Sequence, residues 1–63
     1  MGEYMVNTEF VSSPRVHEGG TAFDLLIGNE QEAYLTSMPL LDFQRLLDSG
    51  KMFVSLGDLT KVE

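Results

Sequence analysis

The fold is decided by the stretch Ser37-Met38-Pro39-Leu40-Leu41-Asp42-Phe43-Gln44-Arg45-Leu46-Leu47-Asp48-Ser49-Gly50. It carries the start and stop signals of one short helix. Ser37 can cap the first turn, Pro39 suits a position whose amide needs no partner, and Gly50 can adopt the left-handed conformation that ends a helix. At about 100° per residue, one side of this helix collects Leu40, Phe43, Leu46 and Leu47. We therefore predict a helix that packs this side against the rest of the chain.

Leu41 falls on the other side of the predicted helix. Its neighbours there are Asp42, Arg45 and Asp48, so an apolar side chain stands on an otherwise polar face. We interpret Leu41 as part of a second contact surface, for a partner molecule. The alternative is that the apolar residues of the helix all pack within the chain's own core.

The other elements are predicted from alternation and turn residues. Residues 21–27 and 31–36 flank Gly28-Asn29-Glu30 and predict a β-hairpin, with positive φ angles at Gly28 and Asn29 and with Leu26 as an apolar residue on the outer face. Residues 51–56 alternate as another strand, which ends at Gly57. Residues 3–11 suit a short strand or an extended arm, and residues 12–20 have the Ser, Pro and Gly content of a loop.

These elements predict an α+β fold of the order ββαβ, with a three-stranded antiparallel sheet and one helix, preceded by an extended N-terminal arm. Residues 1–63 form a single small domain. One helix covers one face of such a sheet and leaves the other face and an edge available for pairing. A chain of 63 residues buries only about 60% of its unfolded surface. Since oligomerisation is the remaining means of adding stability, we expect a homodimer.

The charge indicates which partners to expect. Ten acidic residues stand against four basic ones, which gives a net charge of −6. Such a surface repels nucleic acid, so direct nucleic-acid binding is not expected, but it attracts basic surfaces, including the grooves with which proteins hold DNA. The alternative is that the acidic residues serve solubility. No stretch reaches the roughly 20 apolar residues of a membrane span and no signal peptide is evident, so we expect a cytoplasmic protein without membrane contact.

Catalytic and metal-binding chemistry is not indicated. The chain has no cysteine and one histidine, so neither a disulfide framework nor a zinc site is expected. His17 falls in the predicted loop, where an exposed histidine is the simpler interpretation than a catalytic base. The serines lack the context of an activated nucleophile. We expect a binding protein with no cofactor rather than an enzyme.

The pattern resembles a known family, the small uracil-DNA glycosylase inhibitors of protein-primed Bacillus phages. The likeness covers most of the chain except residues 14–20 and the hairpin tip. It lies in the order of hairpin, short helix and final strand, and in the following positions: Met5-Val6, Glu9-Phe10-Val11, Ser13, Tyr34, Leu40, Asp42-Phe43, Leu59 and Lys61-Val62.

The resemblance implies a dimeric, non-catalytic DNA mimic located in the cytoplasm of the host cell. Its acidic surface would occupy the DNA-binding groove of host uracil-DNA glycosylase, and an apolar pocket at its dimer interface would capture the enzyme's protruding loop side chain. Phe43 matches the helix aromatic of the family and Tyr34 a hairpin aromatic. Gln44 stands where the family has an acidic residue, and Leu47 where it has an aromatic one.

Together with our own candidate for a phosphate-like contact, Glu32, these matches define the expected partner-binding residues: Phe43, Leu47, Gln44, Leu40, Tyr34, Glu32 and Leu41. Two other functions stay open. One is a small phage or bacterial regulator that binds another nucleic-acid-handling host protein. The other is a structural subunit that only forms homodimers.

Overall fold

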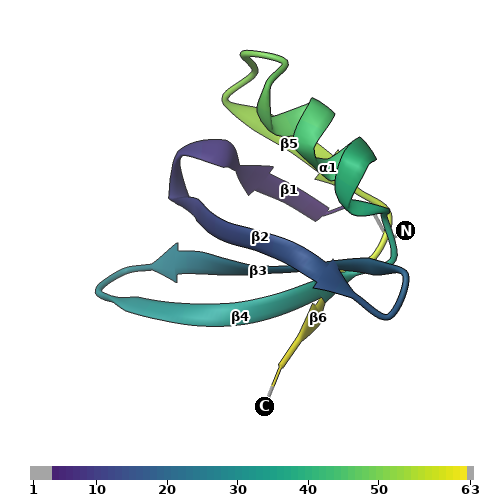
Figure 1. Cartoon of the computed structure of the whole chain (residues 1–63). Coiled ribbons are helices and arrows are strands. Elements are labelled where there is room, and N and C mark those ends of the chain that lie inside the picture. Colours follow the sequence, from purple (N-terminus) through teal and green to yellow (C-terminus); the bar gives the residue numbers. More distant parts are fainter. Residues whose placement is uncertain (1–3, 63) are drawn as a thin grey trace.

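The computed structural model describes residues 4–62 of the chain, and its elements follow one another as Figure 1 shows. An α+β fold is confirmed, with one α-helix among these residues. The elements are β1 (Tyr4–Asn7), the 3-10 helix η1 (Thr8–Phe10), β2 (Val11–His17), β3 (Gly20–Ile27), β4 (Glu30–Thr36), α1 (Leu40–Leu47), β5 (Phe53–Leu56) and β6 (Thr60–Lys61).

The strands form two antiparallel sheets. Four strands make one sheet in the order β2-β3-β4-β6, and β1 pairs with β5 in the other. In Figure 1 the four-stranded sheet forms one layer, and β1, β5 and α1 lie together on one side of it. The core of the protein therefore lies between the larger sheet on one side and the smaller sheet with the helix on the other.

The expected three-stranded sheet does not form. Residues 53–56 were expected to extend the hairpin, but they pair with β1 instead, with Val6 opposite Val54. The hairpin gains its further strand from β6, whose Lys61 lies opposite Tyr34. The β1–β5 pairing turns both valines toward the core, where each is less than 5% exposed, and this burial favours it over extension of the hairpin.

The loop expected over residues 12–20 is also wrong, since most of it is strand. β2 runs to His17, β3 begins at Gly20, and the turn between them uses the positive φ angles of Glu18 and Gly19. Pro14 is tolerated because β2 is an edge strand with an irregularity between Ser12 and Arg15. Of the expected N-terminal arm, residues 4–7 form the strand β1, and residue 3 lies outside the described residues.

The predicted hairpin is confirmed as β3 and β4, whose last pair is Ile27 with Glu30. At its turn Gly28 has a φ of 63°, as predicted, whereas Asn29 keeps a negative φ, contrary to the prediction. Glycine with positive φ at the first central position, followed by a residue of negative φ, is typical of a type II′ turn. One glycine is thus sufficient to close this hairpin.

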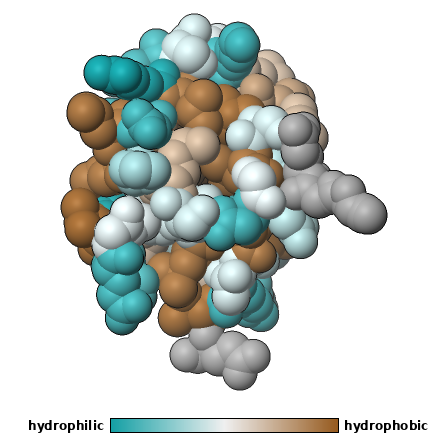
Figure 2. All heavy atoms as spheres, turned by 90° about the vertical axis from the view of Figure 1, so that its right-hand side faces the viewer, coloured by the Kyte–Doolittle hydropathy of each residue, from teal (hydrophilic) through white to brown (hydrophobic). Residues whose placement is uncertain are grey.

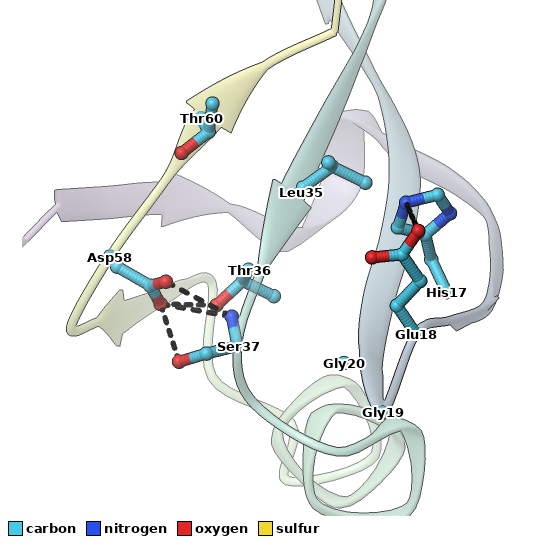
Figure 3. A pocket seen from close by; sticks show the side chains of 9 residues that line it. All are labelled: His17, Glu18, Gly19, Gly20, Leu35, Thr36, Ser37, Asp58 and Thr60. Atoms are coloured by element: carbon cyan, nitrogen blue, oxygen red, sulfur yellow. Dashed lines mark hydrogen bonds and ion pairs between the residues drawn. The ribbon is translucent and has the colours of Figure 1, made fainter.

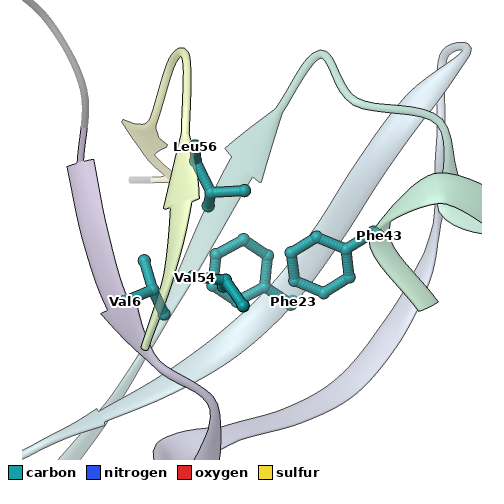
Figure 4. Close-up of a cluster of buried hydrophobic side chains, with 5 residues drawn as sticks. All are labelled: Val6, Phe23, Phe43, Val54 and Leu56. Atoms are coloured by element: carbon teal, nitrogen blue, oxygen red, sulfur yellow. The ribbon is translucent and has the colours of Figure 1, made fainter. Parts of the chain in front are cut away.

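The core consists of five buried apolar side chains drawn from four elements (Figure 4): Val6, Phe23, Phe43, Val54 and Leu56. Both phenylalanines are fully buried. Their ring centroids lie 4.8 Å apart with planes inclined by 28°, so the sheet and the helix meet through this stacked pair. Thr21, also fully buried, donates a hydrogen bond of 2.7 Å to the carbonyl of Met38 just before the helix.

The helix begins at Leu40, with Pro39 as its N-cap residue, and its side chains divide as the spacing predicted. Phe43 is buried, Leu40, Leu46 and Leu47 are partly buried, and Leu41 is exposed. The predicted cap is wrong, because no side chain within residues 4–62 caps the first turn and Ser37 instead bonds to Asp58. The left-handed conformation predicted for Gly50 is confirmed by its φ of 82°, although the helix already ends at Leu47, with Asp48 as its C-cap residue.

Candidate protein-interaction surface

The carboxylate of Asp58 positions the start of the helix relative to the sheets (Figure 3). It accepts hydrogen bonds from the Thr36 hydroxyl at 2.9 Å and from the Ser37 amide and hydroxyl, each at 3.0 Å. The Ser37 amide is the main reason that the pKa of the Asp58 carboxyl lies below its ordinary value of 3.8. A single carboxylate thus joins the β5–β6 connection to the chain that leads from β4 into α1.

A shallow hollow lies between this carboxylate and the turn that joins β2 to β3 (Figure 3). His17 lies on the turn side, where its Nε2 atom is 3.9 Å from Glu18 and about half of its side chain is exposed. The sequence predicted an exposed histidine in a loop. The histidine is exposed, but it is the last residue of β2. No group of three His, Cys, Asp or Glu side chains that could hold a metal ion occurs among residues 4–62.

Phe43, the central candidate for partner binding, lies in the core of the single chain. Its side chain has no exposed area and is stacked on Phe23. The role carried over from the resemblance requires Phe43 to touch a partner, and in this conformation it has no surface to offer. Phe43 therefore supports the helix from beneath, and any contact must be made by its neighbours.

Leu41 is the most exposed apolar side chain of the helix, with 66% of its area accessible. Gln44, the next candidate, is exposed on the same side, and its amide donates to the Asp48 carboxylate at 3.4 Å. Leu40 and Leu47 are partly buried and border the exposed face from the core side. We call the exposed residues of the helix and its C-cap residue the outer helix face; they are Leu41, Asp42, Gln44, Arg45 and Asp48.

The remaining two candidates, Tyr34 and Glu32, lie on β4 rather than on the helix. The ring of Tyr34 stacks on Phe23 at 6.3 Å, and its hydroxyl donates to Glu32 at 3.4 Å. Glu32 also forms an ion pair of 3.2 Å with Lys61. The seven candidates therefore do not form one surface, since Phe23 separates the Tyr34 ring from the helix.

Charge is distributed over both layers of the molecule. The Asp24 carboxylate forms an ion pair with Arg15 at 3.4 Å, and the Glu32 carboxylate forms one with Lys61. Two of the acidic side chains therefore have a basic partner within the chain. Among residues 4–62, five exposed carboxylates have no ion pair: Glu9, Glu30, Asp42, Asp48 and Asp58, of which Asp58 accepts the hydrogen bonds from Thr36 and Ser37. The free acidic charge therefore lies near η1, at the hairpin tip and on the outer helix face.

Several exposed apolar side chains were missed as candidates. Met5 and Phe53, which are 65% and 50% exposed, lie on the outer side of the β1–β5 sheet, opposite to Val6 and Val54. The sequence could have indicated Phe53 through the alternation of residues 53–56. This alternation puts Phe53 and Ser55 on the face of the strand away from Val54 and Leu56. Figure 2 shows one face of the molecule, on which apolar side chains lie among polar ones.

No family model, characterised protein or solved structure matches the chain. Within residues 4–62, no helix is long and apolar enough to cross a membrane.

Proposed function

We propose that the protein is a non-catalytic inhibitor of host uracil-DNA glycosylase. It acts in the host cytoplasm as an acidic DNA mimic that occupies the enzyme's DNA-binding groove. As a homodimer, it captures the enzyme's protruding apolar loop side chain in a pocket between its two copies. The observation that carries the proposal is the exposure of Leu41 on a helix face that also bears Asp42 and Asp48.

The acidic charge supplies the attraction to the groove. A dimer would carry −12, twice the net charge of −6 of one chain, and a DNA-binding groove is basic because it holds phosphates. Exposed charges act over about 10 Å at 0.1 M salt and are screened at higher salt. The charge therefore speeds the encounter and makes its rate sensitive to salt.

The apolar residues of the helix supply the part of the affinity that salt does not weaken. Burying one Leu-sized side chain is worth roughly 1.5–3 kcal/mol. Because Phe43 is fully buried within the single chain, we assign the pocket lining to Leu41, with Leu40 and Leu47 beside it. Gln44 borders this lining as a polar contact, and Tyr34 with Glu32 forms a separate contact on the sheet.

A uracil-excision assay tests the proposal. Purified protein is mixed with bacterial uracil-DNA glycosylase, excision of uracil from DNA is measured, and the mixture is analysed by gel filtration. We expect loss of excision at stoichiometric inhibitor and a stable complex that contains two copies of the chain. Full excision at micromolar excess of the protein would refute the proposal and direct the search to another nucleic-acid-handling host protein.

A further inference from the structure

The inner face of the β3–β4 hairpin continues beyond the core. On β3 the residues that face the core are Phe23, Leu25 and Ile27, and their exposure rises from none at Phe23, through partial burial at Leu25, to 49% at Ile27. In Figure 1 the hairpin turn projects past the helix and past β1 and β5. The last apolar residue of this face therefore lies where the second layer has ended.

Carboxylates stand directly across the hairpin from these apolar side chains. Leu25 lies opposite Glu32, and Ile27 lies opposite Glu30. Residues that are directly opposite in an antiparallel pair project to the same face, with Cβ atoms about 5 Å apart. The hairpin end thus carries an apolar row beside an acidic row, and we call these four residues the hairpin-end surface.

An apolar row beside an acidic row is complementary to a lysine or arginine side chain, which has an aliphatic stem and a positively charged head. Both residues pack their aliphatic stems on apolar surface while their charged heads reach polar groups. The chain itself shows the charged half of such a contact, because the Lys61 Nζ atom lies 3.2 Å from the Glu32 carboxylate. Glu30 is exposed and has no ion pair among residues 4–62, so the outer half of the surface is open to a basic side chain of another molecule.

A second copy of the chain is not a suitable occupant of this surface. The open carboxylate of Glu30 makes this tip a poor match for the same acidic tip of another copy, and it repels the phosphates of nucleic acid. Ile27 is 49% exposed on the same face as Glu30, so the tip offers an apolar contact as well as a charge. The charge selects a basic protein surface as the occupant.

We propose that the hairpin-end surface docks on lysine or arginine side chains in the wall of a basic DNA-binding groove. The stems of these side chains pack on Leu25 and Ile27, and their charged heads bind Glu30. The inference rests on the proposed function for the identity of the groove, that of uracil-DNA glycosylase. It adds a second contact, on the sheet layer, to the one made by the outer helix face.

Binding of purified uracil-DNA glycosylase to matched variants tests this inference. Ile27→Ser removes the apolar part and Glu30→Lys reverses the charged part. The controls are Phe53→Ser, which alters a side chain of nearly equal exposure (50%) on β5, and Glu9→Lys, which reverses another exposed and unpaired carboxylate. Thermal melting confirms that each variant is folded.

We expect Ile27→Ser to weaken binding about tenfold at both low and high salt, because the lost contact is apolar. Glu30→Lys should lower the association rate about tenfold at low salt and much less near 0.5 M salt, where charges are screened. The two controls should stay within about twofold of the wild-type protein. Glu30 is exposed at the start of β4, so Glu30→Lys keeps the test decisive if Ile27→Ser does not fold.

Two failures are distinguishable. If the wild-type protein binds the glycosylase and the two hairpin variants bind it as tightly as their controls do, the hairpin-end inference is wrong and the proposed function stands. If the wild-type protein does not bind the glycosylase, the proposed function and the inference fail together.

Discussion

The rings of Phe23 and Phe43 stack at the centre of the protein, with their centroids 4.8 Å apart and both side chains fully buried. One ring comes from the central part of β3 and the other from the middle of α1. This contact joins the two layers, and it changes the role expected for Phe43. A residue first assigned to partner binding is part of the packing that orients the outer helix face.

Truncation of this pair should unfold the protein rather than affect binding alone. Phe43→Ala removes a fully buried ring, and such changes cost about 3–5 kcal/mol. A domain of this size has little stability to spare, so we expect the variant to be largely unfolded at 25 °C. Urea titration followed by circular dichroism measures the effect.

Phe53→Ala, at a half-exposed position, is the control and should change the unfolding free energy by less than about 1 kcal/mol. A Phe43→Ala protein as stable as the control would show that Phe43 is not a core residue.

The start of β3 lies so close to the end of β4 that we predict a strict requirement for glycine at position 20. A Cβ atom on Gly20 would collide with the backbone carbonyl oxygen of Thr36, whereas a Cβ atom on Gly57 would meet nothing within 4 Å. We expect Gly20→Ala to destabilise the fold by about 1–3 kcal/mol, since backbone must move to accept the methyl group.

Gly57→Ala is the matched control for this change and should leave the unfolding midpoint in urea nearly unchanged. Equal midpoints for the two alanine variants would contradict the predicted contact between Gly20 and Thr36.

The hydrogen bonds of Asp58 predict a dependence of stability on pH. The bonds from Ser37 and Thr36 lower the pKa of this carboxyl in the folded state below the value of 3.8 that it has in the unfolded chain. As the pH falls, the Asp58 carboxyl therefore takes up a proton in the unfolded chain before it does so in the folded protein. The stabilisation of the fold by the ionised carboxylate is complete above pH 3.8. It is lost as the pH falls through the lower, folded-state pKa.

Melting temperatures of wild-type protein and Asp58→Asn between pH 2.5 and about 7 test this dependence. The wild-type protein should melt higher by a constant amount above about pH 5, and the difference should shrink in acid. Asp42→Asn, on the outer helix face, should show a small difference throughout. A difference for Asp58→Asn that stays constant down to the lowest pH would contradict the assigned role of the carboxylate.

The exposed position of Leu41 predicts that binding and folding can be separated there. Leu41→Ser should reduce inhibition of uracil-DNA glycosylase at least tenfold, because it removes the central apolar side chain of the proposed pocket. The melting temperature should change little, because 66% of the side chain is already exposed.

Met5→Ser provides the matched control for the Leu41 variant, since Met5 has an exposure of 65% but lies on β1. Excision assays at several concentrations of each variant, with melting curves of the same samples, make the comparison. If the two variants inhibit equally, the outer helix face is not the contact.

Several features could be predicted from sequence because they depend on neighbours along the chain. The turn at Gly28 closes the hairpin, the apolar spacing places Phe43 inward and Leu41 outward, and Gly50 follows the helix with the left-handed conformation expected there. Turn geometry, helical spacing and the conformation of glycine all act over a few residues. They therefore predict element type without knowledge of the fold.

The features that were missed depend on partners distant in sequence. Residues 12–17 do not look like a strand, because Pro14 and two serines interrupt any alternation, yet hydrogen bonds to β3 make them one. Residues 53–56 alternate as a strand should, but alternation does not say which strand they join. The same limit applies to Ser37, whose predicted capping role is replaced by bonds to Asp58, 21 residues further along the chain.

The sequence by itself determined the hairpin, the helix with its one exposed leucine, and the acidic charge, since each follows from local geometry or composition. Only the tertiary structure decided that β5 pairs with β1, that β6 extends the hairpin, and that Phe43 lies in the core beneath the outer helix face. These outcomes depend on which apolar side chains, far apart in the sequence, pack together and are buried from water. That choice is made by the packing of the whole chain, so no short stretch of sequence contains it.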